Sequence, residues 1–231
     1  MVPQIGVNGA DILGKQNFFE TATKRIVGGQ AGLAYERKLK GPWRLAVGLS
    51  YQQKGYAYKV PVVHSRTNGV PASGSNRVRY QYVQMDVRAR LLTGLGLSEE
   101  DGFYFEFGGY GGLGTSAQHD WSLIFGERNL VRQSGKAQLA FVQKIDYRPD
   151  TTLVRARPWD GGIVLASGYE LRNLRFTVGY MLGLANIQPK AVGKTQGDKI
   201  VKRNEVLFIR FGFPFAIERL TGKKRSPVEI Y

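Results

Sequence analysis

The 231-residue sequence has no cysteine, only two histidines and no run of 18 or more apolar residues. Without cysteine it can form no disulfide, no zinc–cysteine site and no thiol nucleophile. A transmembrane helix needs about 20 consecutive, mostly apolar residues, so the sequence predicts none. The first residues, Met1 to Gln4, lack the charged and apolar regions of a signal peptide. We therefore expect the sequence to be that of a mature chain.

Acidic residues are also scarce, with 18 Asp and Glu against 33 Lys and Arg, which gives a formal charge of +15. Such an excess predicts an anionic partner, which could be a nucleic acid, lipid phosphates or an acidic protein surface. Aromatic residues are frequent at 12 %, and glycine is abundant at 30 residues. This composition is not that of a disordered chain.

The recurrent pattern is alternation of apolar and polar residues, which indicates a β-strand with two different faces. It is clearest between residues 43 and 54. One face there carries an apolar row with aromatic residues at both ends, as expected for a strand that faces lipid. That row consists of Trp43, Leu45, Val47, Leu49 and Tyr51, opposite Arg44, Ala46, Gly48, Ser50, Gln52 and Lys54.

Similar alternation marks further segments, at residues 83–91, 103–108, 174–185 and 207–215, and more weakly at 5–13, 25–38 and 161–171. About eight strands result, each of a length that can cross a membrane when tilted. The connections between them alternate in length. Short ones fall at 40–42, 94–102 and 172–173, and long ones at about 14–24, 60–77, 117–158 and 187–203.

Short turns on one side and long loops on the other are typical of outer-membrane barrels, whose long loops are extracellular. The pattern thus predicts an all-β, antiparallel, up-and-down transmembrane barrel with both termini in the periplasm. Residues 138–147 and 151–157, around Arg148-Pro149-Asp150, could form a hairpin. This hairpin would either project above the membrane or enlarge the barrel to ten strands, and we favour eight.

A soluble barrel would also alternate, but its polar face would be solvated and would not need glycine. A narrow lumen does need residues without side chains, and ten glycines fall on the polar face. They are Gly28, Gly32, Gly48, Gly108, Gly112, Gly162, Gly168, Gly179, Gly183 and Gly212. We therefore predict a membrane barrel over residues 1–216, followed by a basic periplasmic tail over 217–231.

Several motifs together resemble the outer-membrane protein β-barrel domain family of Gram-negative envelopes, the group that includes PorT-like proteins. The resemblance extends from about residue 5 to 215 and implies a fold and a location but no chemistry. The motifs are Gly32-Leu33-Ala34-Tyr35-Glu36, residues 45–51, Gly55-Tyr56, residues 83–91, residues 108–113, Asp160-Gly161-Gly162, Ser167-Gly168-Tyr169, Gly179-Tyr180, residues 183–187 and Phe211-Gly212-Phe213-Pro214-Phe215.

Motifs that would indicate catalysis or nucleotide binding lack their context. Residues 109–114 match G-x-G-x-x-G, but no βαβ unit follows, and Gly193-Lys194-Thr195 lacks the first glycine of a phosphate loop. His64 and His119 lie near Ser65 and Ser122, with Asp120 beside the latter. A lipid-A-modifying rim enzyme is therefore an alternative, although nothing in this spacing makes the base touch the nucleophile. We predict no catalytic residue, cofactor or metal ligand.

Charged residues on the polar faces would point into the lumen, where unpaired ions are costly. We expect them to form a salt-bridged plug, with Glu36 pairing Arg44, Glu170 pairing Arg175, and Arg88 next to Glu106. A narrow passive channel is the alternative. The predicted set is Glu36, Arg44, Asp86, Arg88, Arg90, Glu106, Asp160, Glu170, Arg175 and Arg210.

Cations gather in the predicted loops and tail, and they are the best indication of function. They could balance lipopolysaccharide phosphates or contact another envelope protein; no element suited to nucleic acid is evident. We therefore predict a non-enzymatic scaffold or binding subunit of an envelope assembly. The candidate contacts are Lys190, Lys194, Lys199, Lys202, Arg203, Lys223, Lys224 and Arg225, with further cations at 128, 132, 136, 144, 148, 155 and 157.

Overall fold

The computed structural model describes residues 1–14, 23–64, 71–93, 101–125, 131–139, 141–142, 144–146, 156–192 and 201–215. Within these ranges the regular elements are strands, and no helix is long and apolar enough to cross a membrane. The strands are β1 (Val2–Gly14), β2 (Lys24–Lys38), β3 (Trp43–His64), β4 (Pro71–Leu92), β5 (Gly102–Phe125), β6 (Val131–Leu139), β7 (Lys144–Asp146), β8 (Trp159–Leu171), β9 (Leu174–Gly183), β10 (Lys190–Val192) and β11 (Lys202–Gly212).

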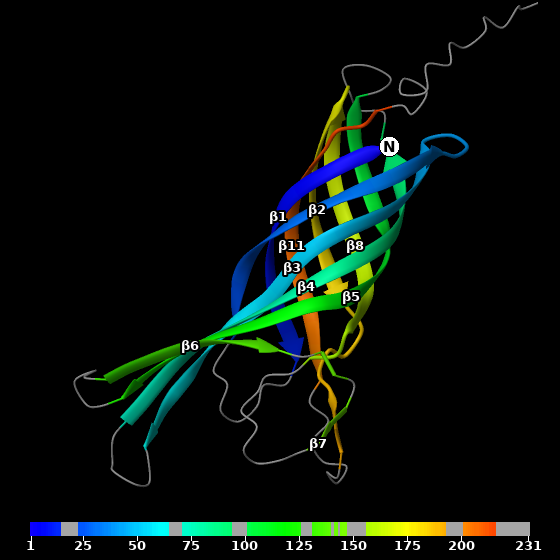
Figure 1. The fold of residues 1–231 in the computed structure, drawn as a ribbon. Coiled ribbons are helices and arrows are strands. Elements are labelled where there is room, and N and C mark those ends of the chain that lie inside the picture. Colours follow the sequence, from blue (N-terminus) through cyan, green and yellow to red (C-terminus); the bar gives the residue numbers. More distant parts are fainter. Residues whose placement is uncertain are drawn as a thin grey trace, which may run out of the picture.

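Eight of these strands form a closed antiparallel barrel (Figure 1). The order around the ring is β1, β2, β3, β4, β5, β8, β9 and β11, and β11 pairs with β1 to close it. Each ring strand therefore lies beside the ring strands that precede and follow it in the chain. The predicted all-β, up-and-down barrel of about eight strands is confirmed.

The two ends of the barrel differ. At one end, which we call the turn end, residues 39–42 connect β2 to β3, and Arg172 and Asn173 connect β8 to β9. Gly41 has φ +68°, a left-handed conformation that glycine adopts without a steric cost. The N-terminus lies at this same end, where the Met1 ammonium group donates to the Phe215 carbonyl at 2.8 Å (Figure 1).

At the opposite end, four strands continue beyond the barrel as a sheet that we call the flap. It consists of the ends of β3 and β5, the start of β4, and β6, which pairs with β5 over residues 117–125 (Figure 1). The prediction of loops at 60–77 and 117–158 is wrong for those of their residues that form the flap strands. The strands stay paired there although the outward apolar row has ended. The alternation of apolar and polar residues therefore stops before the strands do.

The hairpin predicted for residues 138–147 and 151–157 does not enter the ring. β7 instead pairs in parallel with β10, and Phe141 makes an isolated parallel bridge to Ala156. Parts of this segment lie outside the described residues.

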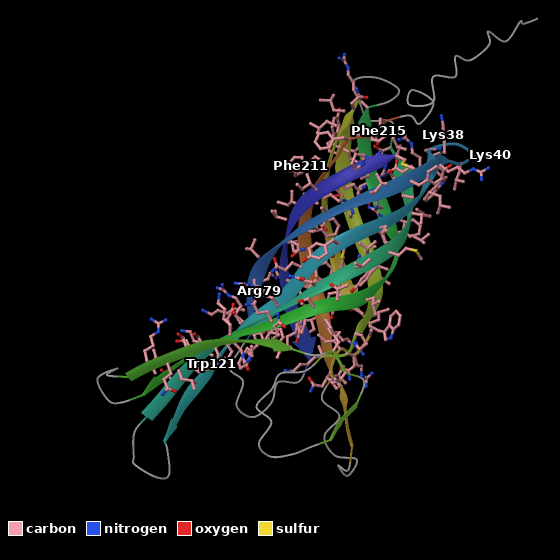
Figure 2. All side chains as sticks on the ribbon, in the orientation of Figure 1. Lys38, Lys40, Arg79, Trp121, Phe211 and Phe215 are labelled. Carbon is pink, nitrogen blue, oxygen red and sulfur yellow. The ribbon has the colours of Figure 1, made fainter. Side chains whose placement is uncertain are left out.

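The outward face of the barrel carries the apolar rows. Leu49 is 59 % exposed and Phe105 55 %, whereas Tyr104 and Glu106 on either side of Phe105 are buried. Several aromatic side chains of this face contact one another between different strands near the turn end. These pairs are Phe103 with Tyr169, Phe176 with Phe211, and Trp43 with Phe107. Figure 2 shows Phe211 and Phe215 near the turn end, as expected for an aromatic girdle at a membrane interface.

Candidate functional site

The barrel interior contains a network of ion pairs centred on Glu106 of β5. This carboxylate accepts hydrogen bonds from three guanidinium groups: Arg88 at 2.7 Å, Arg90 through Nε at 2.8 Å, and Arg210 at 3.1 Å. Arg88 also donates to Asp86 at 2.5 Å. The side chains of Arg88, Arg90 and Glu106 are at most 1 % exposed. Strict alternation along β4 and β5 places these residues on the inward face.

Two further carboxylates join this network from the turn end. Glu36 of β2 contacts Arg90 at 2.9 Å and also Arg175 of β9, which lies 139 residues away in the sequence. Glu170 of β8 contacts Arg175 at 2.7 Å and Arg44 of β3 at 3.1 Å. The network therefore spans the lumen and connects strands from both halves of the chain.

The structure brings nine of the ten predicted lumen residues into this network and places Asp160 in a separate layer. Glu170 lies beside Arg175, and Arg88 beside Glu106, as the strand registers suggested. Arg44 pairs with a different acid from the one that we predicted. We predicted Glu36 because a short turn joins their strands, but Arg44 reaches Glu170 and Glu36 reaches Arg90 and Arg175. Side chains in a narrow barrel can pair across the lumen as well as along one hairpin.

A second polar layer lies nearer the flap and is built around Lys54 of β3. Its ammonium group donates to Asp160 at 2.8 Å and to Gln84 at 2.9 Å, and it lies 4.4 Å from the centroid of the Tyr110 ring. Asn204 donates to the same Asp160 oxygen at 2.9 Å. Lys54 stood on the predicted polar face, but we did not include it among the lumen charges.

Glycine makes room for these side chains. A Cβ atom at Gly48 would lie 2.9 Å from both carboxylate oxygens of Asp86, which is closer than real Cβ contacts. This is the close approach that the abundance of glycine on the polar faces predicted.

The mouth of the lumen at the flap end is lined by aromatic side chains. Tyr56, Tyr80 and Tyr82 are buried there, and Phe141 packs against the rings of Tyr80 and Tyr82. Lys202 also points into this cluster: it is 6 % exposed, and its ammonium group lies 5.4 Å from the Tyr56 ring centroid. We predicted Lys202 as a contact to an external anionic partner, and its burial does not suit that role.

The outward face of the flap carries a group of cations that we call the basic flap face. Register places Ala57, Arg77, Asp120 and Lys136 in one row across the four flap strands. Asp120 lies 3.5 Å from Arg79. The basic flap face consists of Lys59, Arg77, Arg79, Arg132 and Lys136. Figure 2 shows Arg79 on the flap, far from Lys38 and Lys40 at the turn end.

Of the other predicted cations, Arg203 is exposed on the outward face of β11, opposite Leu13 of β1. The backbone of Lys190 belongs to β10. Lys194, Lys199, Lys223, Lys224 and Arg225 lie outside the described residues. Arg132 and Lys136 were among the predicted loop cations, whereas Arg77 and Arg79 were missed, because residues 60–77 were predicted as a loop and the strand pattern was recognised only from residue 83. The regular spacing of residues 75, 77 and 79 was the available signal.

The residues of the alternative rim enzyme do not converge in the described part of the chain. His119 faces the inner side of the flap, where its Nε2 lies 2.9 Å from Asn76 Oδ1. Ser122 and Asp120 lie on the opposite, outward face of β5, and Asp120 pairs with Arg79. Burial lowers the pKa of His119 below 6.5, against the opposing effect of Asp120. The His64 side chain and Ser65 lie outside the described residues.

The described residues contain no group of three or more His, Cys, Asp or Glu side chains arranged to hold a metal ion. A closed antiparallel barrel with a charged interior and an apolar exterior defines a class, the outer-membrane β-barrel proteins. Residues 2–188 match the family described as outer membrane protein beta-barrel domain, and the chain belongs to this family. Its location is therefore the outer membrane. This match does not distinguish the PorT-like group, which stays a prediction.

Two solved structures of Ail, the attachment invasion locus protein of Yersinia pestis, are similar to this chain. Both are 10 % identical in sequence, and the matches cover 93 % of this chain and 97 % of each Ail chain, with TM-scores of 0.35 and 0.37. In the second of them Ail is in complex with the heparin analogue sucrose octasulfate. None of the curated proteins matches the chain significantly.

Proposed function

We propose that this protein is a non-enzymatic outer-membrane barrel with a plugged lumen, whose basic flap face binds the phosphate groups of lipopolysaccharide. By the general rule for such barrels, the turn end faces the periplasm and the flap lies outside the cell. The observation that carries the proposal is the basic flap face itself. It continues the same outward strand faces that are apolar around the barrel, so it would stand directly above the hydrocarbon layer.

The charges of this face suit a phosphorylated lipid headgroup. Five cations are accompanied by the single acid Asp120 among the outward residues of the described flap strands. Serine and glutamine side chains between the cations can add hydrogen bonds to phosphate or sugar oxygens. Each cation near a charged membrane surface contributes about 1 kcal/mol to binding.

The test is binding of the detergent-purified protein to vesicles that contain lipopolysaccharide. A variant with Arg77→Gln, Arg132→Gln and Lys136→Gln should bind on the order of a hundredfold more weakly. The matched control removes three exposed cations at the turn end, with Arg37→Gln, Lys38→Gln and Lys40→Gln, and should bind as the parent does. Equal binding by all three proteins, or undiminished binding to dephosphorylated lipopolysaccharide, would contradict the proposal.

The plugged lumen is supported by the buried ion pairs around Glu106, since an eight-stranded barrel leaves an interior that side chains just fill. A narrow passive channel is the competing function. Discrete openings of the purified protein in a planar bilayer would favour the channel, and their absence would favour the plug.

A role as a scaffold subunit rests on the basic residues at the turn end and in the predicted tail. Pull-down from native membranes should recover another envelope protein or bound lipid. The rim-enzyme alternative predicts that His119→Ala changes the mass spectrum of lipid A, whereas the non-enzymatic proposal predicts identical spectra.

A further inference from the structure

We propose that the barrel interior holds one monatomic anion, a chloride ion under physiological conditions, next to Arg210. The site is a small cavity of about 10 Å³ between β1, β2, β3 and β11. Its lining consists of Gln4, Gln30, Ala31, Gly32, Ser50 and Arg210. It is separate from the basic flap face and lies among inward side chains.

The lining of the cavity presents hydrogen-bond donors and no carboxylate. The buried Nε atom of Arg210 and the buried Nε2 atom of Gln4 have no hydrogen-bond partner among the described residues. Gln30 Nε2 makes only a long contact of 3.5 Å, to the Ile209 carbonyl. The Ser50 hydroxyl accepts at 3.5 Å from Gln52, which leaves its own proton free to point toward the cavity. A lining that offers several donor groups and no carboxylate suits an anion.

Among the described residues, the ion-pair network beside the cavity contains one more cation than acid. Within the described part of the chain, five guanidinium groups, those of Arg44, Arg88, Arg90, Arg175 and Arg210, form ion pairs with four carboxylates, those of Glu36, Asp86, Glu106 and Glu170. The charges of Lys54 and Asp160 balance each other in the second polar layer, nearer the flap. Asp101, a further buried acid at the turn end, accepts from the backbone N–H of Arg172.

Among the buried guanidinium groups of this network, Arg210 lies farthest from its nearest carboxylate, which it shares with two others. Its ion-pair partner is Glu106 at 3.1 Å, and that carboxylate also holds Arg88 and Arg90 at shorter distances. Arg210 is 5 % exposed. A buried charge that is only partly compensated is unfavourable, so a counter-ion beside Arg210 would stabilise the fold.

The size of the cavity selects the anion. A volume of about 10 Å³ corresponds to roughly one water-sized sphere, which excludes phosphate, sulfate and carboxylates. Gly32 lines the cavity, and Gly6 lies beside the Gln30 side chain that lines it. A Cβ atom at Gly6 would lie 2.8 Å from Gln30 Nε2, and one at Gly32 would lie 2.6 Å from Ser50 Cβ. The flexible Gln4 and Gln30 side chains can adjust to the larger radius of a halide.

The experiment measures unfolding of the detergent-purified protein in chloride, bromide and gluconate at constant ionic strength. Chloride and bromide should stabilise the parent relative to gluconate. At ten times the dissociation constant, the ratio of folded to unfolded protein rises about elevenfold. Arg210→Gln should abolish this difference, and Gln4→Leu should reduce it. Arg203→Gln removes an exposed cation of the same strand and should leave the halide effect unchanged.

Crystals grown in bromide provide a measurement on the parent protein, which does not depend on the folding of any variant. An anomalous peak between Gln4, Gln30 and Arg210 is expected. Two results would overturn the proposal: unfolding of the parent that is identical in the three salts, or a bromide crystal whose cavity contains only a water molecule.

Discussion

Lys54 and Asp160 form an ion pair of 2.8 Å whose two side chains are completely enclosed in the barrel. They come from β3 and β8, which are not neighbours in the ring, so the pair connects opposite walls. Burial makes the pair costly to form but also costly to break, because either ion left alone would be buried without compensation.

Replacing one partner of this pair should therefore destabilise the barrel strongly. Asp160→Asn leaves the Lys54 ammonium group without a counter-charge and should lower the free energy of unfolding by about 3–5 kcal/mol. Urea unfolding, followed by the mobility difference between unboiled and boiled protein in gels, measures this loss. The control is Arg25→Gln in the exposed pair with Glu205, which should cost less than about 1 kcal/mol. Similar losses in both variants would contradict the buried role of Lys54.

Side-chain volume inside the lumen should be tolerated less well than on the outer wall. Gly48→Val would push the Asp86 carboxylate away from Arg88, at a cost of about 1–3 kcal/mol. Gly29, one strand away, faces outward, and a Cβ atom added there would meet no described atom within 4 Å. Gly29→Val should fold as well as the parent. The folded fraction on unboiled gels compares the two, and equal folding would argue against a filled lumen.

The outward apolar row can be tested with a charge. Leu49 is exposed near the middle of the barrel wall, and Leu49→Arg should destabilise the protein in lipid bilayers by about 2–4 kcal/mol. Gln81→Arg on the outward face near the flap should change stability by less than about 1 kcal/mol, since arginine there is close to the interface. The measurement is reversible unfolding in phospholipid vesicles. If Leu49→Arg were neutral, this face would be in contact with water.

The flap should loosen at acidic pH. The folded flap lowers the pKa of His119 below its ordinary value of 6.5 by burial, so the unfolded flap binds a proton more readily. The stabilisation is present above pH 6.5 and decreases as the pH falls through that region. Hydrogen exchange of residues 117–125 should therefore be faster at about pH 5.5 than at about pH 7.5, after correction for the intrinsic rate. In His119→Gln this corrected difference should disappear; if it persists, another group is responsible.

Much of the barrel could be predicted because a strand in a membrane must present one face to lipid and one to a narrow lumen. Rows such as Leu45, Val47 and Leu49 opposite Ala46 and Gly48 are a direct consequence of that requirement. The flap could not be predicted as strand in the same way. Its outward residues, for example Arg77 and Arg79, are as polar as those of a loop, and only pairing with β3 and β5 keeps them in a sheet.

The sequence by itself determined the class of the fold, the number of ring strands and the inward face of the ten predicted lumen charges, because alternation depends on local backbone geometry alone. Tertiary structure decided which charges meet. Glu36 pairs with Arg175 across 139 residues, and Lys54 with Asp160 across the lumen, because closure of the ring brings strands distant in sequence to opposite walls of one narrow space. The surplus cation Arg210 and its cavity likewise exist only once that ring has closed.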